Sequence, residues 1–216
     1  MIFLFFLFSI TQAYKLCVIG ATSGLGRELV YQAALDKNMS VLALSGKEGP
    51  VPIPCRVDSF QELRNRPPFV NPNMVRGNYW QDITKYNYET VVFTTGAEPF
   101  KKDYSDTLMA KVMTHLPNSC KHVILVSAHG VGDSLIPNEI GINVMDSWYL
   151  KDVYRAKNEQ EQMLGLDLFK TKYPYLKTTV FRPRALSFGK TMIPSITRQQ
   201  LASDILDCAE KIDSKE

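Results

Sequence analysis

Short runs of apolar and β-branched residues recur along the chain, and a segment of different pattern follows each run. The runs lie at 15–19 (KLCVI), 40–44 (SVLAL), 73–76 (NMVR), 90–95 (TVVFTT), 122–127 (HVILVS) and 178–182 (TTVFR). They are apolar throughout instead of alternating between apolar and polar residues. This pattern is typical of parallel strands that are covered on both faces.

Segments with helical spacing of apolar residues lie between these runs, at 25–36, 104–116, about 146–172 and 199–212. Strands that alternate with helices over short links predict an α/β fold with a single doubly wound parallel sheet. The stretch 46–72 interrupts the alternation because it holds six of the twelve prolines. Only 59–66 is expected to form a short helix there.

The first ten residues, MIFLFFLFSI, are almost uniformly apolar and are too few to span a membrane core of about 30 Å as a helix. Thr11 and Ala13 would be the small residues at −3 and −1 of a cleavage site after Ala13. We therefore expect 1–13 to be a targeting segment and 14–216 to be the folded domain, with no stable membrane span in the mature chain. The segment lacks Lys and Arg, so an extra apolar strand or a misassigned start codon stays open.

A cleaved segment would send the domain into the secretory route or, in algae with complex plastids, onward to the plastid; without cleavage the protein would be cytoplasmic. The length of 216 residues fits one domain, and 45% hydrophobic residues allow a true core. The net charge of +3, without a long basic run, argues against a nucleic-acid partner. The four cysteines and three histidines lack metal-ligand spacing, so no metal site is expected.

A glycine-rich segment, GATSGLGR at 20–27, directly follows the first predicted strand and opens the first predicted helix. Gly20 permits a tight turn, Gly24 lets the backbone approach a pyrophosphate, and Gly26 allows close packing of helix and strand. The helix N-terminus offers free N–H groups to phosphate. The segment therefore predicts a dinucleotide site in a Rossmann-type domain, although a glycine-rich turn without a ligand is the alternative. Its predicted binding residues are Gly20, Thr22, Ser23, Gly24, Leu25, Gly26 and Arg27.

The sequence GATSGLGRE resembles the glycine segment of short-chain dehydrogenase/reductases. The remainder is similar to their small atypical branch, the NmrA-like and flavin-reductase-like NAD(P)-binding proteins. The similar segments are HVILVSAHGVG, YRAKNEQEQML, LKTTVFRPRAL and PSITRQQLASDIL. The resemblance runs from Lys15 to the end of the chain, with the motifs in the same order.

Two departures from the family pattern concern chemistry. The atypical branch usually has glycine where this chain has Ser23, while Gly24 matches the classical spacing. Classical members use Tyr-x-x-x-Lys; here Lys157 is present, but Val153 occupies the tyrosine position. Tyr154 lies three residues before Lys157, within helical reach of the same face.

Further contacts are implied by the resemblance. Asn78 would lie beside the adenine, Thr95 and Gly96 would line the cofactor, and Pro183 would lie near the carboxamide. Ser127 would end the fifth strand at the site, and Lys157 would bond the nicotinamide ribose. A strand-end cap and a surface helix residue, respectively, are the alternatives for these two. His129 could donate a proton in place of tyrosine because histidine titrates near neutrality; a loop histidine without that role is the alternative.

The end of the second strand bears on the choice of cofactor. An NAD site would have Asp or Glu near there, whereas this chain reads ALSGK with no acid before Glu48. Ser45 and Lys47, with Arg27, could accept a 2′-phosphate, so NADP(H) is expected over NAD(H). Lys47 as a solvated loop residue is the alternative.

Two functions from different classes are consistent with these observations. The first is a small atypical NADP(H)-dependent oxidoreductase whose small-molecule substrate is a carbonyl, quinone or flavin-like compound. The second is a non-catalytic protein that senses NAD(P)H or assists assembly. The absence of a tyrosine four residues before Lys157 supports it.

Overall fold

The structure is a computed structural model that describes residues 14–45, 74–78, 83–96, 104–132, 150–184, 186–187 and 195–211. The expected targeting segment at 1–13, the expected short helix at 59–66 and Lys47 lie outside these ranges. Within them, no helix is long and apolar enough to cross a membrane.

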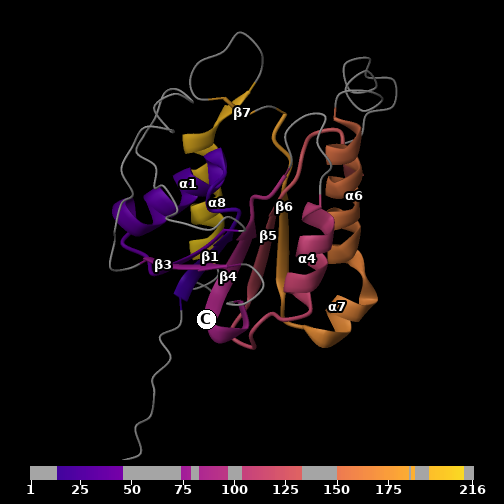
Figure 1. Cartoon of the computed structure of the whole chain (residues 1–216), viewed down its shortest axis with the longest axis horizontal. Coiled ribbons are helices and arrows are strands. Elements are labelled where there is room, and N and C mark those ends of the chain that lie inside the picture. The colour runs from indigo at the N-terminus through magenta and orange to yellow at the C-terminus, as the bar shows by residue number, and fades with distance from the viewer. Residues whose placement is uncertain are drawn as a thin grey trace, which may run out of the picture.

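Six parallel strands form the main sheet in the order β3-β2-β1-β4-β5-β6 (Figure 1). The strands are β1 (Tyr14–Ile19), β2 (Val41–Ser45), β3 (Met74–Asn78), β4 (Tyr88–Phe93), β5 (His122–Val126) and β6 (Lys177–Phe181). β1 lies in the middle of the sheet, β2 and β3 follow on one side of it, and β4, β5 and β6 follow on the other. This order is that of the Rossmann fold and confirms the predicted doubly wound sheet.

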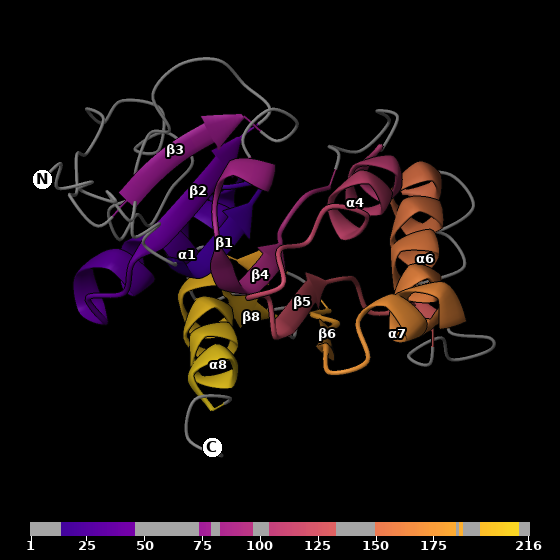
Figure 2. The same ribbon diagram turned by 90° about the horizontal axis from the view of Figure 1, so that it is seen from below.

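The helices cover the two faces of this sheet (Figure 2). One face holds α1 (Gly24–Tyr31), which continues into the π-helical turn η1 (Gln32–Asp36), and α8 (Arg198–Glu210). The other holds α4 (Ser105–Met113), α6 (Lys151–Gly165) and α7 (Asp167–Lys172). A 3-10 turn, η2 (Ile83–Lys85), precedes β4, and a small parallel pair, β7 (Leu186–Ser187) and β8 (Ile196–Thr197), precedes α8.

The prediction of one continuous helix up to residue 172 was wrong. The chain leaves helical geometry at Leu166, where ψ is 132°, and α7 starts at the next residue. Gly165, the last residue of α6, is a poor helix former. The break lets α7 turn so that Phe169 is buried in the core.

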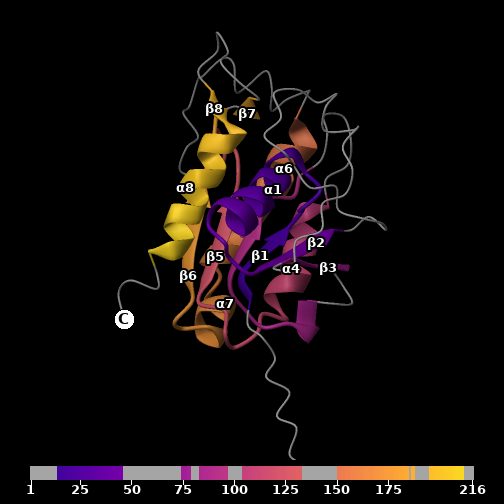
Figure 3. The same cartoon turned by 90° about the vertical axis from the view of Figure 1, so that its left-hand side faces the viewer.

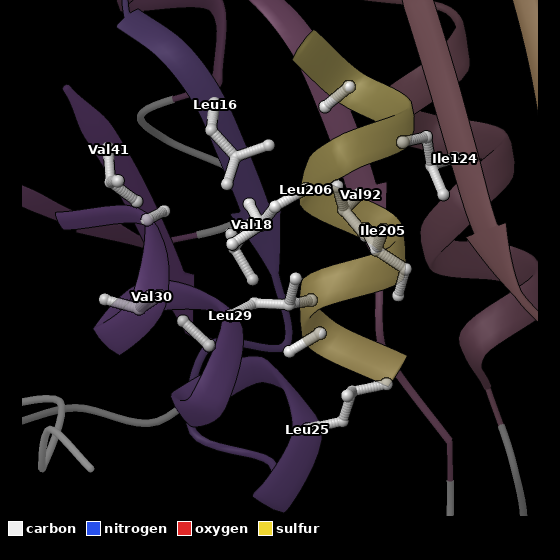
Figure 4. Close-up of a cluster of buried hydrophobic side chains, with 14 of the residues drawn as sticks. Leu16, Val18, Leu25, Leu29, Val30, Val41, Val92, Ile124, Ile205 and Leu206 are labelled. Carbon is white, nitrogen blue, oxygen red and sulfur yellow. The ribbon is translucent and has the colours of Figure 1, made fainter. Parts of the chain in front are cut away.

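Alternate residues of the central strands fill two cores. On β1, Leu16 and Val18 face α1 and α8 (Figure 4), whereas Cys17 and Ile19 face the layer of α4 and α6. The expectation of strands covered on both faces holds for β2 and β5, which are buried at every residue. It fails for β6, whose residues are half-buried or exposed, because β6 is an edge strand that has a neighbour on one side only among the described strands.

The position of the site follows from this topology. The connection from β1 leads to α1 on one face, and the connection from β4 leads to α4 on the other (Figure 3). Adjacent strands whose connections leave in opposite directions create a crevice beyond their carboxyl ends, where open α/β sheets bind ligands. In this chain the crevice lies between β1 and β4.

Candidate functional site

The turn after β1 requires glycine. Gly20 has φ +90°, in the left-handed region, and the Ser23 N–H donates to its carbonyl oxygen at 2.8 Å. A side chain at Gly20 would place its Cβ 2.8 Å from the Thr94 hydroxyl oxygen, at the end of β4. The turn therefore has both a conformation and a neighbour that exclude other residues.

The N-terminus of α1 opens directly from this turn. Ser23 is the N-cap: its hydroxyl accepts the Gly26 N–H at 2.9 Å, and its carbonyl accepts the Arg27 N–H at 2.9 Å. The N–H groups of Gly24 and Leu25 have no acceptor within the helix, because they belong to its first turn. That turn contains no acidic residue. These groups and the helix dipole together offer a site for an anion.

Gly26 and Thr94 hold the turn against β4. A Cβ on Gly26 would overlap the carbonyl oxygen of Gly20, so helix and turn approach more closely than any other residue allows. The Thr94 hydroxyl lies 3.0 Å from the Ile19 carbonyl oxygen, 3.2 Å from that of Gly20, and 3.2 Å from the Ser23 hydroxyl. Sequence reasoning missed Thr94; its position as the first residue after a buried strand was the available signal.

Lys157 of α6 lies at the carboxyl ends of the neighbouring strands. Its side chain is 5% exposed, and its ammonium group donates to the carbonyl oxygens of Thr95 at 2.5 Å and Val126 at 2.9 Å. The lysine thus holds the loop after β4 and the end of β5 together. This places it at the carboxyl ends of β4 and β5, beside the crevice, and not on the solvent face of its helix.

Two buried hydroxyls lie beside these carbonyls. Among the described residues, Thr95 Oγ1 and Ser127 Oγ have no hydrogen-bond partner. Leaving a buried hydroxyl unpaired costs about 1–3 kcal/mol, so such groups usually face a ligand or a water. A ribose or carboxamide of a dinucleotide carries the polar groups that would fit here.

The loops after β5 and β6 meet at the same end of the sheet. The His129 N–H donates to the Pro183 carbonyl oxygen at 3.0 Å, so two predicted site residues are directly joined. Tyr154 lines a hollow of about 350 Å³ under the same β5 loop, with Gly130, Val131 and Gly132. A second hollow of about 380 Å³ lies between the end of β6 and α8, and Pro183 lines it.

The residues expected at the adenosine end lie along β2 and β3. The Ser45 hydroxyl donates to the Thr22 hydroxyl at 3.3 Å, and Ser45 is buried, so in this conformation it faces the glycine turn. Asn78 pairs with Ser45 across the strands, and Arg27 is half-buried in the first turn of α1. Gly96 is exposed just beyond β4.

Another polar contact near the β5 loop is an ion pair. Arg182, at the end of β6, binds the Glu161 carboxylate of α6 through Nε at 3.0 Å and through Nη2 at 2.6 Å. A Cβ on Gly132, which has φ +55°, would contact that carboxylate. The β5 loop is therefore fixed against α6 and β6.

Solved structures of the same fold resemble this chain at low sequence identity. They include a short-chain dehydrogenase/reductase from Veillonella parvula in complex with NADP, at TM-score 0.59 and 15% identity, over 91% of this chain and 88% of that one. ChuY, an anaerobilin reductase from Escherichia coli O157:H7, has TM-score 0.55 and 16% identity over 90% of each chain. The Bordetella bronchiseptica enzyme WbmH in complex with NAD⁺ has TM-score 0.60 and 12% identity, over 92% of this chain and 73% of that one.

No protein-family model matches the chain, and no curated protein matches it in sequence. At identities this low, the structural neighbours establish the Rossmann fold alone.

Proposed function

We propose that the chain binds a nicotinamide dinucleotide and acts as a small oxidoreductase of the short-chain dehydrogenase/reductase type. The observation that carries the proposal is the N-terminus of α1. Its Gly24 and Leu25 amides, which have no acceptor within the helix, follow a left-handed glycine turn at the switch point of a doubly wound sheet. The structural neighbours support it, since they include complexes with NADP and NAD⁺ and a reductase.

The chemistry would be hydride transfer, which the bound nicotinamide supplies. The chain's own residues would orient the reacting groups. Lys157 fixes the Thr95 and Val126 carbonyls at the crevice, and the Thr95 and Ser127 hydroxyls offer hydrogen bonds to a bound ribose or substrate. His129 lies in the adjoining loop and is our candidate proton donor, whereas Tyr154 lines the hollow under that loop.

We propose NADP(H) as the preferred cofactor and a carbonyl, quinone or flavin-like compound as substrate. The absence of an acid between Ser45 and Glu48 in the sequence supports NADP(H), because NAD sites use an acid there for the ribose 2′-OH. The half-buried Arg27 of α1 is our candidate partner for the 2′-phosphate.

The test is isothermal titration of the protein with NADPH and NADH, repeated on Gly24→Asp. We expect wild type to bind NADPH in the micromolar range, and Gly24→Asp to bind at least about a hundredfold more weakly. The new carboxylate would oppose the phosphate charge at the amides that bind it. Gly165→Asp is the matched control, because a Cβ at Gly165 has no atom within 4 Å.

Loss of binding in Gly24→Asp with retention in Gly165→Asp supports the dinucleotide site. A well-folded wild type that binds neither cofactor refutes it. Binding without oxidation of NADPH by a panel of carbonyls, quinones and flavins would favour the non-catalytic alternative instead.

A further inference from the structure

The first residue of α8 lies at the glycine turn of α1. Thr197 caps α8 by accepting the Gln200 N–H at 3.1 Å, which makes Arg198 its first helical residue. The two helices pack side by side, and the Gln32 side chain donates to the Gln199 carbonyl oxygen at 3.0 Å. Their N-terminal ends therefore lie next to each other (Figure 3).

Arg198 fills the space that the missing side chain of Gly24 leaves. A Cβ on Gly24 would stand 2.9 Å from Arg198 Nε and 3.3 Å from its Cδ. The stem and guanidinium of Arg198 therefore lie directly on the backbone at the start of α1. The side chain is half-buried, and this desolvation lowers the pKa of its guanidinium, which nevertheless keeps its charge because arginine is not deprotonated in proteins.

The first turns of the two helices at this contact carry no negative side chain. The positive ends of two helix dipoles thus meet a guanidinium at Gly24. A guanidinium can bind a phosphate through two parallel N–H groups, with a geometry that a lysine cannot reproduce.

We propose that the side chain of Arg198, which extends from α8 to the glycine turn, binds the pyrophosphate of the dinucleotide. This inference rests on the proposed function. The pyrophosphate is the expected partner because it lies at the N-terminus of the first helix in Rossmann sites, where Gly24 is. The ribose 2′ position lies instead at the end of the second strand, which the contact of Thr22 with Ser45 marks in this chain.

The test compares wild type with Arg198→Gln by titration with NADPH, NADH and ADP-ribose, which all contain the pyrophosphate. We expect all three to bind about tenfold to a hundredfold more weakly to the variant, the range for losing a charge-assisted hydrogen bond. Lys211→Gln is the matched control, since it removes one positive charge from the opposite, exposed end of the same helix. Its affinities should equal those of wild type.

The outcomes separate this inference from the proposed function. If NADPH alone weakens, Arg198 contacts the 2′-phosphate, and the pyrophosphate assignment is overturned. If no affinity changes while wild type binds, the inference is overturned and the proposed function stands. If wild type binds none of the three compounds, both are overturned. If Arg198→Gln does not fold, Arg198→Lys, which keeps the charge but loses the planar fork, should weaken all three ligands by a smaller common factor.

Discussion

At the scale of single residues, the crevice is built from groups that are under-satisfied without a ligand. Thr95 Oγ1 and Ser127 Oγ are buried without a partner among the described residues, and Lys157 holds the carbonyls beside them. Such groups lower the stability of the free protein and gain hydrogen bonds when a polar ligand arrives. Removal of one of these hydroxyls should therefore weaken ligand binding without lowering the free energy of unfolding.

Ser127→Ala is the direct test of this expectation. Removing an unpaired buried hydroxyl should leave the free energy of unfolding unchanged or raise it by up to about 1 kcal/mol, while NADPH affinity falls about tenfold. Urea unfolding and isothermal titration measure the two quantities.

Ser119→Ala is the control for this prediction, because the Ser119 hydroxyl donates to the Tyr88 carbonyl oxygen at 3.1 Å, away from the crevice. It should lose about 1 kcal/mol of stability with unchanged affinity. A destabilised Ser127→Ala with full NADPH affinity would contradict the role assigned to Ser127.

At the scale of elements, β5 and β6 carry a buried histidine between them and α8. His122 is fully buried, its Nε2 lies 2.8 Å from the Thr179 hydroxyl of β6, and Cys208 of α8 contacts the same hydroxyl. Burial lowers the pKa of His122 to about 4, and Lys177, directly across the strands, adds to this shift by charge repulsion. The packing of these elements therefore depends on a neutral imidazole.

This depressed pKa predicts a specific loss of stability in acid. The unfolded chain takes up a proton at His122 near pH 6.5, whereas the folded chain does so only near pH 4. The contribution of the neutral His122 to the free energy of unfolding is therefore fully present above pH 6.5, and it is lost as the pH falls from 6.5 to 4.

We expect the free energy of unfolding of wild type to fall by about 3 kcal/mol more than that of His122→Gln between pH 7 and pH 4. Urea unfolding across this range measures the difference, in which the titration of all other groups cancels. Parallel curves for the two proteins would show that His122 does not titrate as its burial implies.

At the scale of the whole molecule, the sheet begins where the targeting segment is expected to end. The Tyr14 N–H donates to the Asn87 carbonyl oxygen at 2.8 Å, and Tyr14 pairs with Tyr88 on β4. Cleavage after Ala13 would therefore leave β1 complete. A secretory or plastid destination remains our proposal on the basis of the segment's pattern.

We predict that the mature protein from its native cell begins at Tyr14, which N-terminal sequencing or intact-mass measurement determines. Ala13→Arg should block cleavage, because the −1 position requires a small residue. Gln12→Asn is the control at the tolerant −2 position and should be processed normally. A mature chain that begins at Met1 would rule out the cleaved segment.

Much of the fold was predictable because its signals are local. Each predicted strand overlaps the observed one, with ends that differ by at most two residues. The break at Leu166 was missed because the apolar spacing continues through it, and only the packing of Phe169 makes the turn favourable. The exposure of β6 was missed because an edge strand is defined by the absence of a neighbour, which its own residues do not record.

The sequence by itself determined the doubly wound architecture and the glycine turn that opens the first helix, because hydrophobic period and the conformational freedom of glycine act over a few consecutive residues. Only the tertiary structure decided which distant groups lie against that turn. Thr94 meets Ser23 across 71 residues, and Arg198 reaches Gly24 from the last helix. Such contacts depend on strand order and helix packing, so no local pattern in the sequence specifies them.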